Sequence, residues 1–448
     1  MYGAKQRGQG RSELLVFPAI LGLSVVGLMV SEDGSPVLGI LVSTCIFAVV
    51  LRLVDDRNPI QMLFLVGYGT FLYAPAVLSS IEYGTSFELF YLSSAIAAFF
   101  LRFTKGLVHV QQEYAPAGVR RLFAGVSALV VAGAFLIPDL VGSLFPLEIM
   151  LFTMALGSRT RAVNLRCLLY FLAALASYSL VAWNGFGRTV VAGWLLVAFL
   201  YYCYASGVRA SKLLFGLAPA AGSFLLTTRE LFSGGFATVE AVLGDSAFGP
   251  YRLASTFAAH AQTWGLDLPG FFDQVIFTLF VFVPRDIWPE KPYGFGFEYT
   301  VKNFDAYLVA AGHSVAATFI GEHLYYLGYW GLLTAVVMSY TVAALCRLIY
   351  GIRVLHGHGI ALVACSVPVL VWGGMTSFSA RLALPLIVML AVLPLVAIAA
   401  SRGPSEGRIS ARSEHGDDIT RMSEEEPRRG MLPYSTEPSG GVQDARPR

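Results

Sequence analysis

Continuous apolar runs of about 20 residues recur along most of this chain, and they restrict the folds that it can adopt. A helix of about that length crosses the hydrocarbon core of a bilayer. The runs are unbroken rather than alternating, which favours helices over transmembrane strands. Of the 448 residues, 56% are hydrophobic and only 13% are charged, whereas soluble domains carry roughly a quarter charged residues. The sequence therefore predicts an all-α polytopic membrane protein.

The positions of the cations relative to these runs predict the topology. Cytoplasmic loops of membrane proteins are enriched in Lys and Arg, and the strongest such signal here is the segment that holds Arg159, Arg161 and Arg166. We predict about 12 transmembrane helices, with both termini in the cytoplasm. The expected spans are residues 13–30, 36–53, 60–78, 89–103, 122–137, 145–156, 167–183, 189–205, 213–227, 324–347, 359–376 and 382–400.

The same reading divides the chain into five regions. Residues 1–12 are a polar cytoplasmic N-terminus, and residues 13–227 form a transmembrane scaffold of about nine helices. Residues 228–323 form a large loop region on the outer face, and residues 324–400 supply three further transmembrane helices. The last stretch, 401–448, is rich in Ser, Gly, Pro, Glu and Arg, which predicts a disordered cytoplasmic tail.

One apolar run, residues 271–283, is too short to cross a bilayer at about 1.5 Å per residue. The predicted topology requires the interval 228–323 to begin and end outside. We therefore expect this run to form a short re-entrant or interfacial helix. It leads into a polar segment, FVPRDIWPEKPYGF, whose residues 284–295 are the predicted site loop.

Cations on the outer face oppose the usual charge bias, so those retained at span ends suggest a function. Each one could instead extend to a lipid headgroup or pair with a local acid. The guanidinium fork binds phosphate oxygens in bidentate fashion, and flanking prolines restrict the backbone around Arg285 and Lys291. A diphosphate-binding cluster is predicted from Arg188, Arg252, Arg285, Lys291 and Arg381.

Two residues are candidates for a general base. Glu322 stands at the predicted mouth of a spanning helix, where a carboxylate is costly and marks a functional hypothesis. Alternatively, it stabilises a helix N-terminus or pairs with an arginine. His313 could accept a hydroxyl proton, or be an interfacial histidine with a satisfied hydrogen bond. His356 and His358 are expected in a solvated cytoplasmic turn.

Motifs for metals and nucleotides are not found in the sequence. It contains no DxD, no HExxH, no Cys/His pair at ligand spacing and no Walker motif. We therefore predict neither a metal site nor a cofactor.

Several segments resemble the bacterial oligosaccharide repeat-unit polymerases, the O-antigen polymerase (Wzy-type) family. VPRDIWPEKP, residues 283–292, is similar to their PR-x-x-W-P-x-K-P loop, and GEHLYYLGYWG, from Gly321, is similar to the helix start that follows it. NGFGRT at residues 184–189 and SAR at 379–381 are similar to their Gly-Arg turn and late outer arginine. After Glu322 the chain departs from the family pattern, with Tyr326-Leu327-Gly328 in place of Asn-Phe-Gly.

The resemblance implies a metal-independent inverting glycosyltransferase in the bacterial plasma (inner) membrane. It would polymerise oligosaccharide units carried on undecaprenyl diphosphate into an O-antigen or exopolysaccharide on the outer face. The clustered cations would stabilise the departing diphosphate, and Glu322 or His313 would deprotonate the acceptor. We expect lipid-linked oligosaccharides and membrane lipids as partners, together with a chain-length regulator and a flippase of the same pathway, and no nucleic acid.

Two alternative functions remain open. An O-antigen ligase-type glycan transferase shares the outer arginines and the large outer loop, but its loss would leave long lipid-linked glycan rather than single units. A transporter or flippase of lipid-linked sugars requires charges along a path between the two faces. In this chain the candidate charges gather on one predicted face.

Overall fold

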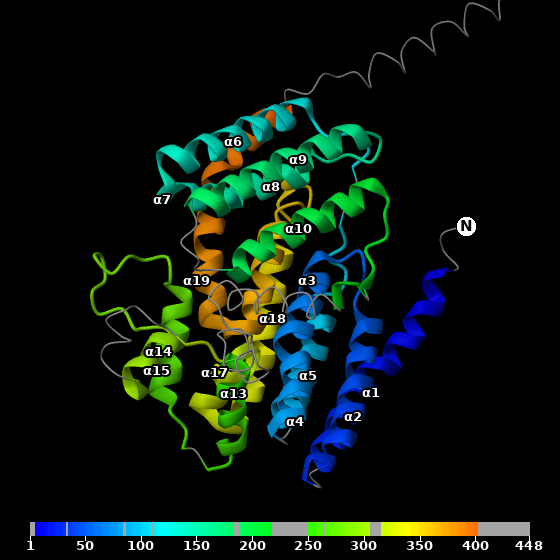
Figure 1. Cartoon of the computed structure of the whole chain (residues 1–448), viewed down its shortest axis with the longest axis vertical. Helices are drawn as coiled ribbons and strands as arrows, with labels where there is room; N and C mark the ends of the chain where they lie inside the picture. Colours follow the sequence, from blue (N-terminus) through cyan, green and yellow to red (C-terminus); the bar gives the residue numbers. More distant parts are fainter. Residues whose placement is uncertain are drawn as a thin grey trace, which may run out of the picture. The chain divides into compact units, whose positions relative to one another are not determined.

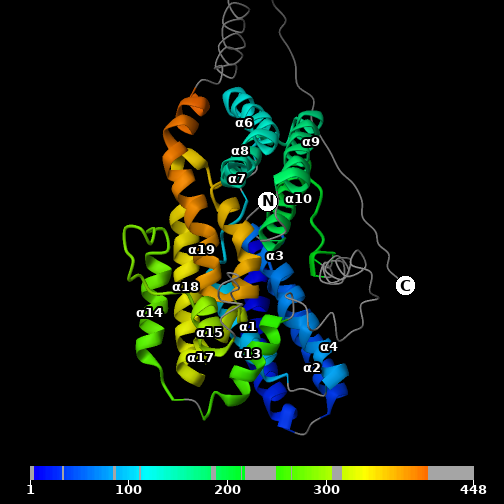
Figure 2. The ribbon, with the colours of Figure 1, turned by 60° about the vertical axis from the view of Figure 1, so that its left-hand side comes forward.

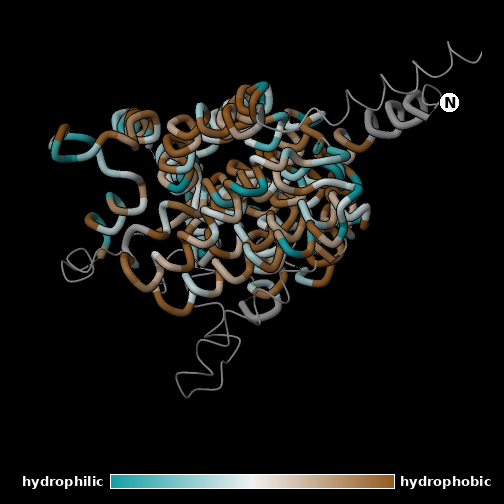
Figure 3. Tube along the Cα trace, turned by 90° about the horizontal axis from the view of Figure 1, so that it is seen from above, coloured by the Kyte–Doolittle hydropathy of each residue, from teal (hydrophilic) through white to brown (hydrophobic). Residues whose placement is uncertain are grey.

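The computed structural model describes residues 5–32, 35–83, 87–109, 112–182, 188–212, 214–216, 249–263, 265–304 and 315–401. Every element in these ranges is a helix, which confirms the predicted all-α class. Seven of the described helices are long and apolar enough to cross a membrane, so the predicted number of about 12 is not confirmed. Hydrophobic segments cover most of the trace, and hydrophilic residues are concentrated in short stretches (Figure 3).

The first half of the described chain begins with a bundle around α3. Every residue of α3 is buried, and the helix packs against α19. Its start is set locally, because the Asn58 side chain accepts the N–H groups of Ile60 and Gln61 and Pro59 occupies the first position. α3 continues through the π-helical η1 into α4. The elements are α1 (Lys5–Glu32), α2 (Pro36–Leu53), α3 (Pro59–Tyr68), η1 (Gly69–Tyr73), α4 (Ala74–Tyr83) and α5 (Glu88–Phe103).

A second group of helices follows, and both ribbon views place it at the end of the bundle opposite α13, α14, α15 and α17 (Figures 1 and 2). α6 packs on α8 and α9, and α10 packs on α9 and α19. Stacked rings of Phe145 and Trp194, with centroids 4.5 Å apart, join α8 to α10. The elements are α6 (Ala117–Leu136), α7 (Pro138–Val141), η2 (Gly142–Leu144), α8 (Phe145–Ala155), α9 (Arg161–Ser177), η3 (Tyr178–Ala182) and α10 (Arg188–Ser206).

The remaining elements carry most of the predicted site. α14 packs against α17 and α19, and α17 packs against α13, α18 and α19. α14 contains 12 residues, begins three residues before the predicted partial helix and ends at Leu279. The elements are α13 (Gly249–His260), α14 (Leu268–Leu279), α15 (Phe295–Asn303), α17 (Thr318–Leu327), η4 (Gly328–Trp330), α18 (Gly331–Tyr350), η5 (Arg353–Leu355) and α19 (Ile360–Ser401).

Gly374 divides α19 into two arms, residues 360–373 and 375–401. Its φ of 76° and ψ of −168° are not helical, and this combination is essentially restricted to glycine. A Cβ on Gly359 would lie 3.6 Å from Met389 Sδ, so the start of the first arm lies beside the second arm. The expected spans 359–376 and 382–400 predict a turn at residues 377–381, and this is wrong, because those residues are helical and the bend occurs at the glycine.

Other expected boundaries also differ. α17 begins at Thr318, so Glu322 lies within the helix rather than at its mouth. Lys5 already begins α1, within the stretch expected to be a polar N-terminus. The expectations for His313, for most of the span 213–227, for residues 228–248 and for the tail after residue 401 lie outside the described residues.

Candidate functional site

A cavity of about 240 Å³ lies between α8, η3, α10 and both arms of α19. Tyr178 and Trp194 supply aromatic wall, and Ser366 and Arg381 supply polar groups from the two arms of α19. The volume is below the roughly 300–1,000 Å³ of pockets that enclose a drug-sized ligand. The cavity therefore suits one compact part of a larger ligand.

Positive charge reaches this cavity from two directions. Arg381 lies in the cavity wall together with Tyr178. α10 begins at Arg188, and Val190 and Val191 in its first turn also line the cavity. The N–H groups of a first helical turn lack intrahelical partners and favour anions. The cavity therefore borders both a guanidinium and the first turn of α10.

Arg285 does not line this cavity. Its Nη1 donates to the carbonyl oxygen of Lys291 at 2.6 Å, and its Nη2 donates to that of Pro292 at 2.9 Å. The guanidinium also lies 3.7 Å from the ring centroid of Tyr293. These contacts bind the guanidinium to the loop that follows α14 and give it a role in shaping that loop, and its role as a diphosphate ligand stays a prediction.

Lys291 has a similar role. Its Nζ donates to the carbonyl oxygen of Val283 at 2.6 Å, and the residue is only 7% exposed. Burial, with a smaller contribution from Arg285, lowers the pKa of this ammonium below its usual value. Lys291 closes the loop on itself and does not line the cavity. Arg252, exposed on α13, does not line it either.

Glu322 is buried at the bend of α19. Its carboxylate accepts the backbone N–H of Thr376 at 3.2 Å, the hydroxyl of the same residue and the backbone N–H of Met375. It therefore caps the N-terminus of the second arm. Thr376 lies one helical turn, about 6 Å, before Ala380 in the cavity wall. The alternative of a carboxylate at a helix N-terminus thus matches the contacts, although the helix end belongs to α19 rather than α17.

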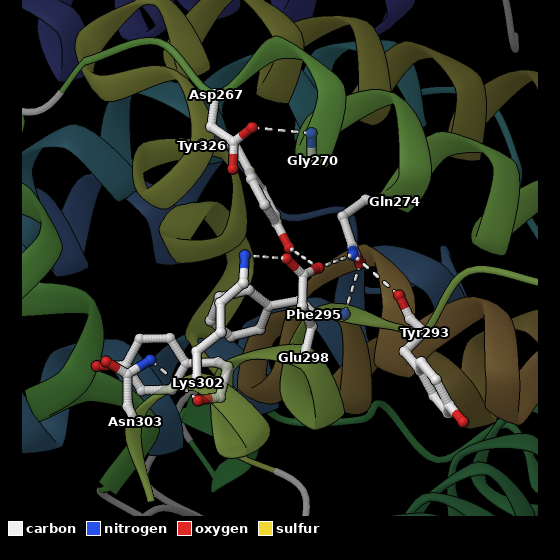
Figure 4. Close-up of polar contacts among 10 residues, drawn as sticks. Asp267, Gly270, Gln274, Tyr293, Phe295, Glu298, Lys302, Asn303 and Tyr326 are labelled. Carbon is white, nitrogen blue, oxygen red and sulfur yellow. Dashed lines mark hydrogen bonds and ion pairs between the residues drawn. The ribbon is translucent and has the colours of Figure 1, made fainter.

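A polar network that the sequence analysis missed joins α14, α15 and α17 (Figure 4). Its centre is Glu298, whose Oε2 accepts the Tyr326 hydroxyl at 2.7 Å and the Gln274 amide at 3.0 Å. Its Oε1 pairs with Lys302 at 2.5 Å. Gln274 also accepts the N–H of Phe295 at 2.5 Å. The i, i+4 spacing of Glu298 and Lys302 was the available sequence signal.

Comparisons with protein-family models, with curated proteins and with solved structures found no match for this chain. Within the described residues, no three His, Cys, Asp or Glu side chains are grouped to hold a metal. The cavity itself offers Arg381 and the first turn of α10 in its wall, and Glu322 is buried at the bend of α19.

Proposed function

We propose that the chain is a metal-independent inverting membrane glycosyltransferase. It polymerises undecaprenyl-diphosphate-linked oligosaccharide units into a surface polysaccharide on the outer face of the plasma membrane. The observation that carries the proposal is the cavity wall that holds Arg381 and borders the first turn of α10. A compact anionic group such as a diphosphate suits this wall, because guanidinium and helix N-terminus both stabilise phosphate oxygens.

In the proposed reaction, a hydroxyl oxygen of the incoming lipid-linked unit attacks the anomeric carbon of the growing chain. The bond from that carbon to the phosphate oxygen breaks, and undecaprenyl diphosphate leaves with the electron pair. Arg381 stabilises the negative charge that develops on this group. The hydroxyl proton passes to a base, for which Glu322 and His313 are the candidates. Inversion follows from attack on the face opposite the leaving group.

The aromatic wall also supports a sugar ligand. Tyr178 and Trp194 line the cavity together with Arg381, and such side chains combine apolar contact with hydrogen bonding. Glu322 accepts the backbone N–H of Thr376, which lies one helical turn before Ala380 in the cavity wall. A shift of the second arm would therefore be transmitted to both groups.

The test uses purified protein in lipid with a short oligosaccharide on undecaprenyl diphosphate, in the presence of EDTA and without nucleotide sugar. The proposal predicts a ladder of longer lipid-linked chains and release of undecaprenyl diphosphate. Transfer of glycan only to a different lipid would identify a ligase. Movement of the substrate between leaflets without any new glycosidic bond would identify a transporter.

Arg381→Ala is the decisive variant. We expect it to lower the rate of chain growth by at least about 100-fold, the scale measured when one preorganised transition-state donor is removed. Arg381→Lys keeps a positive charge but loses the bidentate guanidinium fork, so its rate of chain growth should lie between those of the wild type and Arg381→Ala. Arg166→Ala, an exposed arginine on α9, is the matched control and should grow chains at the wild-type rate. Equal activity in Arg381→Ala and the control would reject the proposed subsite.

A further inference from the structure

A second buried polar group lies where three distant segments meet, and the proposed transfer reaction does not use it. His109 follows α5, Tyr201 and Tyr204 belong to α10, and His358 precedes α19. The His109 ring centroid lies 5.6 Å from that of His358, 4.9 Å from that of Tyr201 and 5.0 Å from that of Tyr204. We call these four residues the histidine–tyrosine cluster.

The expectation that His358 occupies a solvated turn is wrong. The residue is 2% exposed, whereas its neighbour His356 is exposed. Among the described residues, neither ring nitrogen of buried His358 has a hydrogen-bond partner, and neither has the hydroxyl of Tyr201, which is fully buried. Buried polar atoms are almost always paired, so three unpaired atoms in one cluster call for a ligand or an ordered water.

The ring geometry is compatible with a shared metal ion. Imidazole nitrogens bind Zn²⁺ at about 2.0–2.1 Å, which places each ring centroid about 3.2 Å from the ion. If one nitrogen of each ring binds the same ion, centroids 5.6 Å apart correspond to an angle of about 120° at the metal. The two rings are inclined by 75°, so they do not stack face to face.

The ligand type limits the choice of ion. Imidazole prefers borderline ions such as Zn²⁺, Co²⁺ and Ni²⁺ over Mg²⁺ or Ca²⁺.

We propose that the histidine–tyrosine cluster is a binding site for one borderline divalent ion, with His109 and His358 as ligands and the Tyr201 hydroxyl or water completing the coordination. The ion would take no chemical part in the proposed transfer reaction. α10 and α19 carry both this cluster and walls of the 240 Å³ cavity. A bound ion would therefore link the two helices and hold those walls together.

The experiment measures metal binding and thermal stability in tag-free, full-length protein that has been stripped with chelator. Zn²⁺ or Co²⁺ is added, unbound ion is removed, and bound metal is counted by mass spectrometry. We expect one ion per chain and a rise in the unfolding midpoint, because a ligand that binds only the folded state stabilises it. Co²⁺ should also show the visible absorption of a nitrogen-ligated site.

Two variants and a control make the result specific. His358→Phe and His109→Phe keep ring volume and remove the ligand, so each should lose both the ion and the metal-dependent stabilisation. His356→Asn removes the adjacent exposed histidine, whose φ of 45° asparagine tolerates, and should bind metal like the wild type. If wild-type protein binds no ion, or if the Phe variants bind as well as the control, the cluster holds water alone and the proposal fails.

Discussion

Replacing Gly374 with alanine tests the architecture of the site directly. The residue has φ 76° and ψ −168°, a conformation that costs a non-glycine residue about 1–3 kcal/mol. A Cβ there would lie 2.6 Å from Glu322 Cδ and 2.9 Å from the carbonyl oxygen of Thr318. Glu322 would have to shift and weaken its bonds to Thr376, which costs roughly 1–3 kcal/mol for each lost bond. We expect Gly374→Ala to be destabilised by about 3 kcal/mol or more.

The assay is thermal unfolding in detergent at a fixed scan rate. For a chain of this length, each kcal/mol lost from the free energy of unfolding lowers the midpoint temperature by roughly 1 °C. The midpoint of Gly374→Ala should therefore drop by about 3–5 °C. Gly125→Ala is the control, because Gly125 is exposed in α6 and a Cβ there meets nothing within 4 Å. Its midpoint should stay or rise slightly, since alanine favours a helix.

The two variants therefore have opposite expected signs. A midpoint for Gly374→Ala that matches or exceeds the control would refute the bend at Gly374 and the position of Glu322 beside it. In a double-mutant cycle, Glu322→Ala should relieve part of the damage, because the side chain that the new Cβ meets is then shorter. Strict additivity of the two changes would show that they are not in contact.

The polar loop and its neighbours allow two further predictions. Glu298→Ala should lower the unfolding midpoint clearly more than Glu298→Gln. Glutamine keeps an acceptor for the Tyr326 hydroxyl, and the half-exposed ion pair with Lys302 contributes little to stability. Equal midpoints for the two variants would argue against the network. Arg285→Lys should speed protease cleavage within residues 280–294 several-fold, because lysine cannot make the paired hydrogen bonds to two loop carbonyl groups. An unchanged cleavage rate would show that other contacts hold the loop.

Several properties follow from local sequence alone. The helical class and the presence of bilayer-length apolar helices depend on composition within a window of about 20 residues. The length of the apolar run before the polar loop likewise limits α14, which is 12 residues long in the structure. Hydropathy and helix length are properties of a single segment, so they need no knowledge of what packs against it.

The functional site depended on contacts between segments that the sequence does not place together. The sequence identified the polar loop but could not show that Arg285 and Lys291 would bind its own carbonyl groups. The sequence predicted the last turn at residues 377–381, whereas the bend occurs at Gly374. There Glu322 caps the second arm of α19. Nor could the sequence show that His358 would be buried against His109 and Tyr201.

The physical reason is the range of the interactions. The apolar runs predict helices because burial of their side chains in lipid or protein is favourable wherever the helices lie. A charged or polar side chain in the same chain must find specific partners at hydrogen-bond distance. Those partners come from other segments, or from the loop once it has folded. Apolar patterning thus determined the helices, and only the tertiary structure decided what Arg381, Glu322 and His358 face.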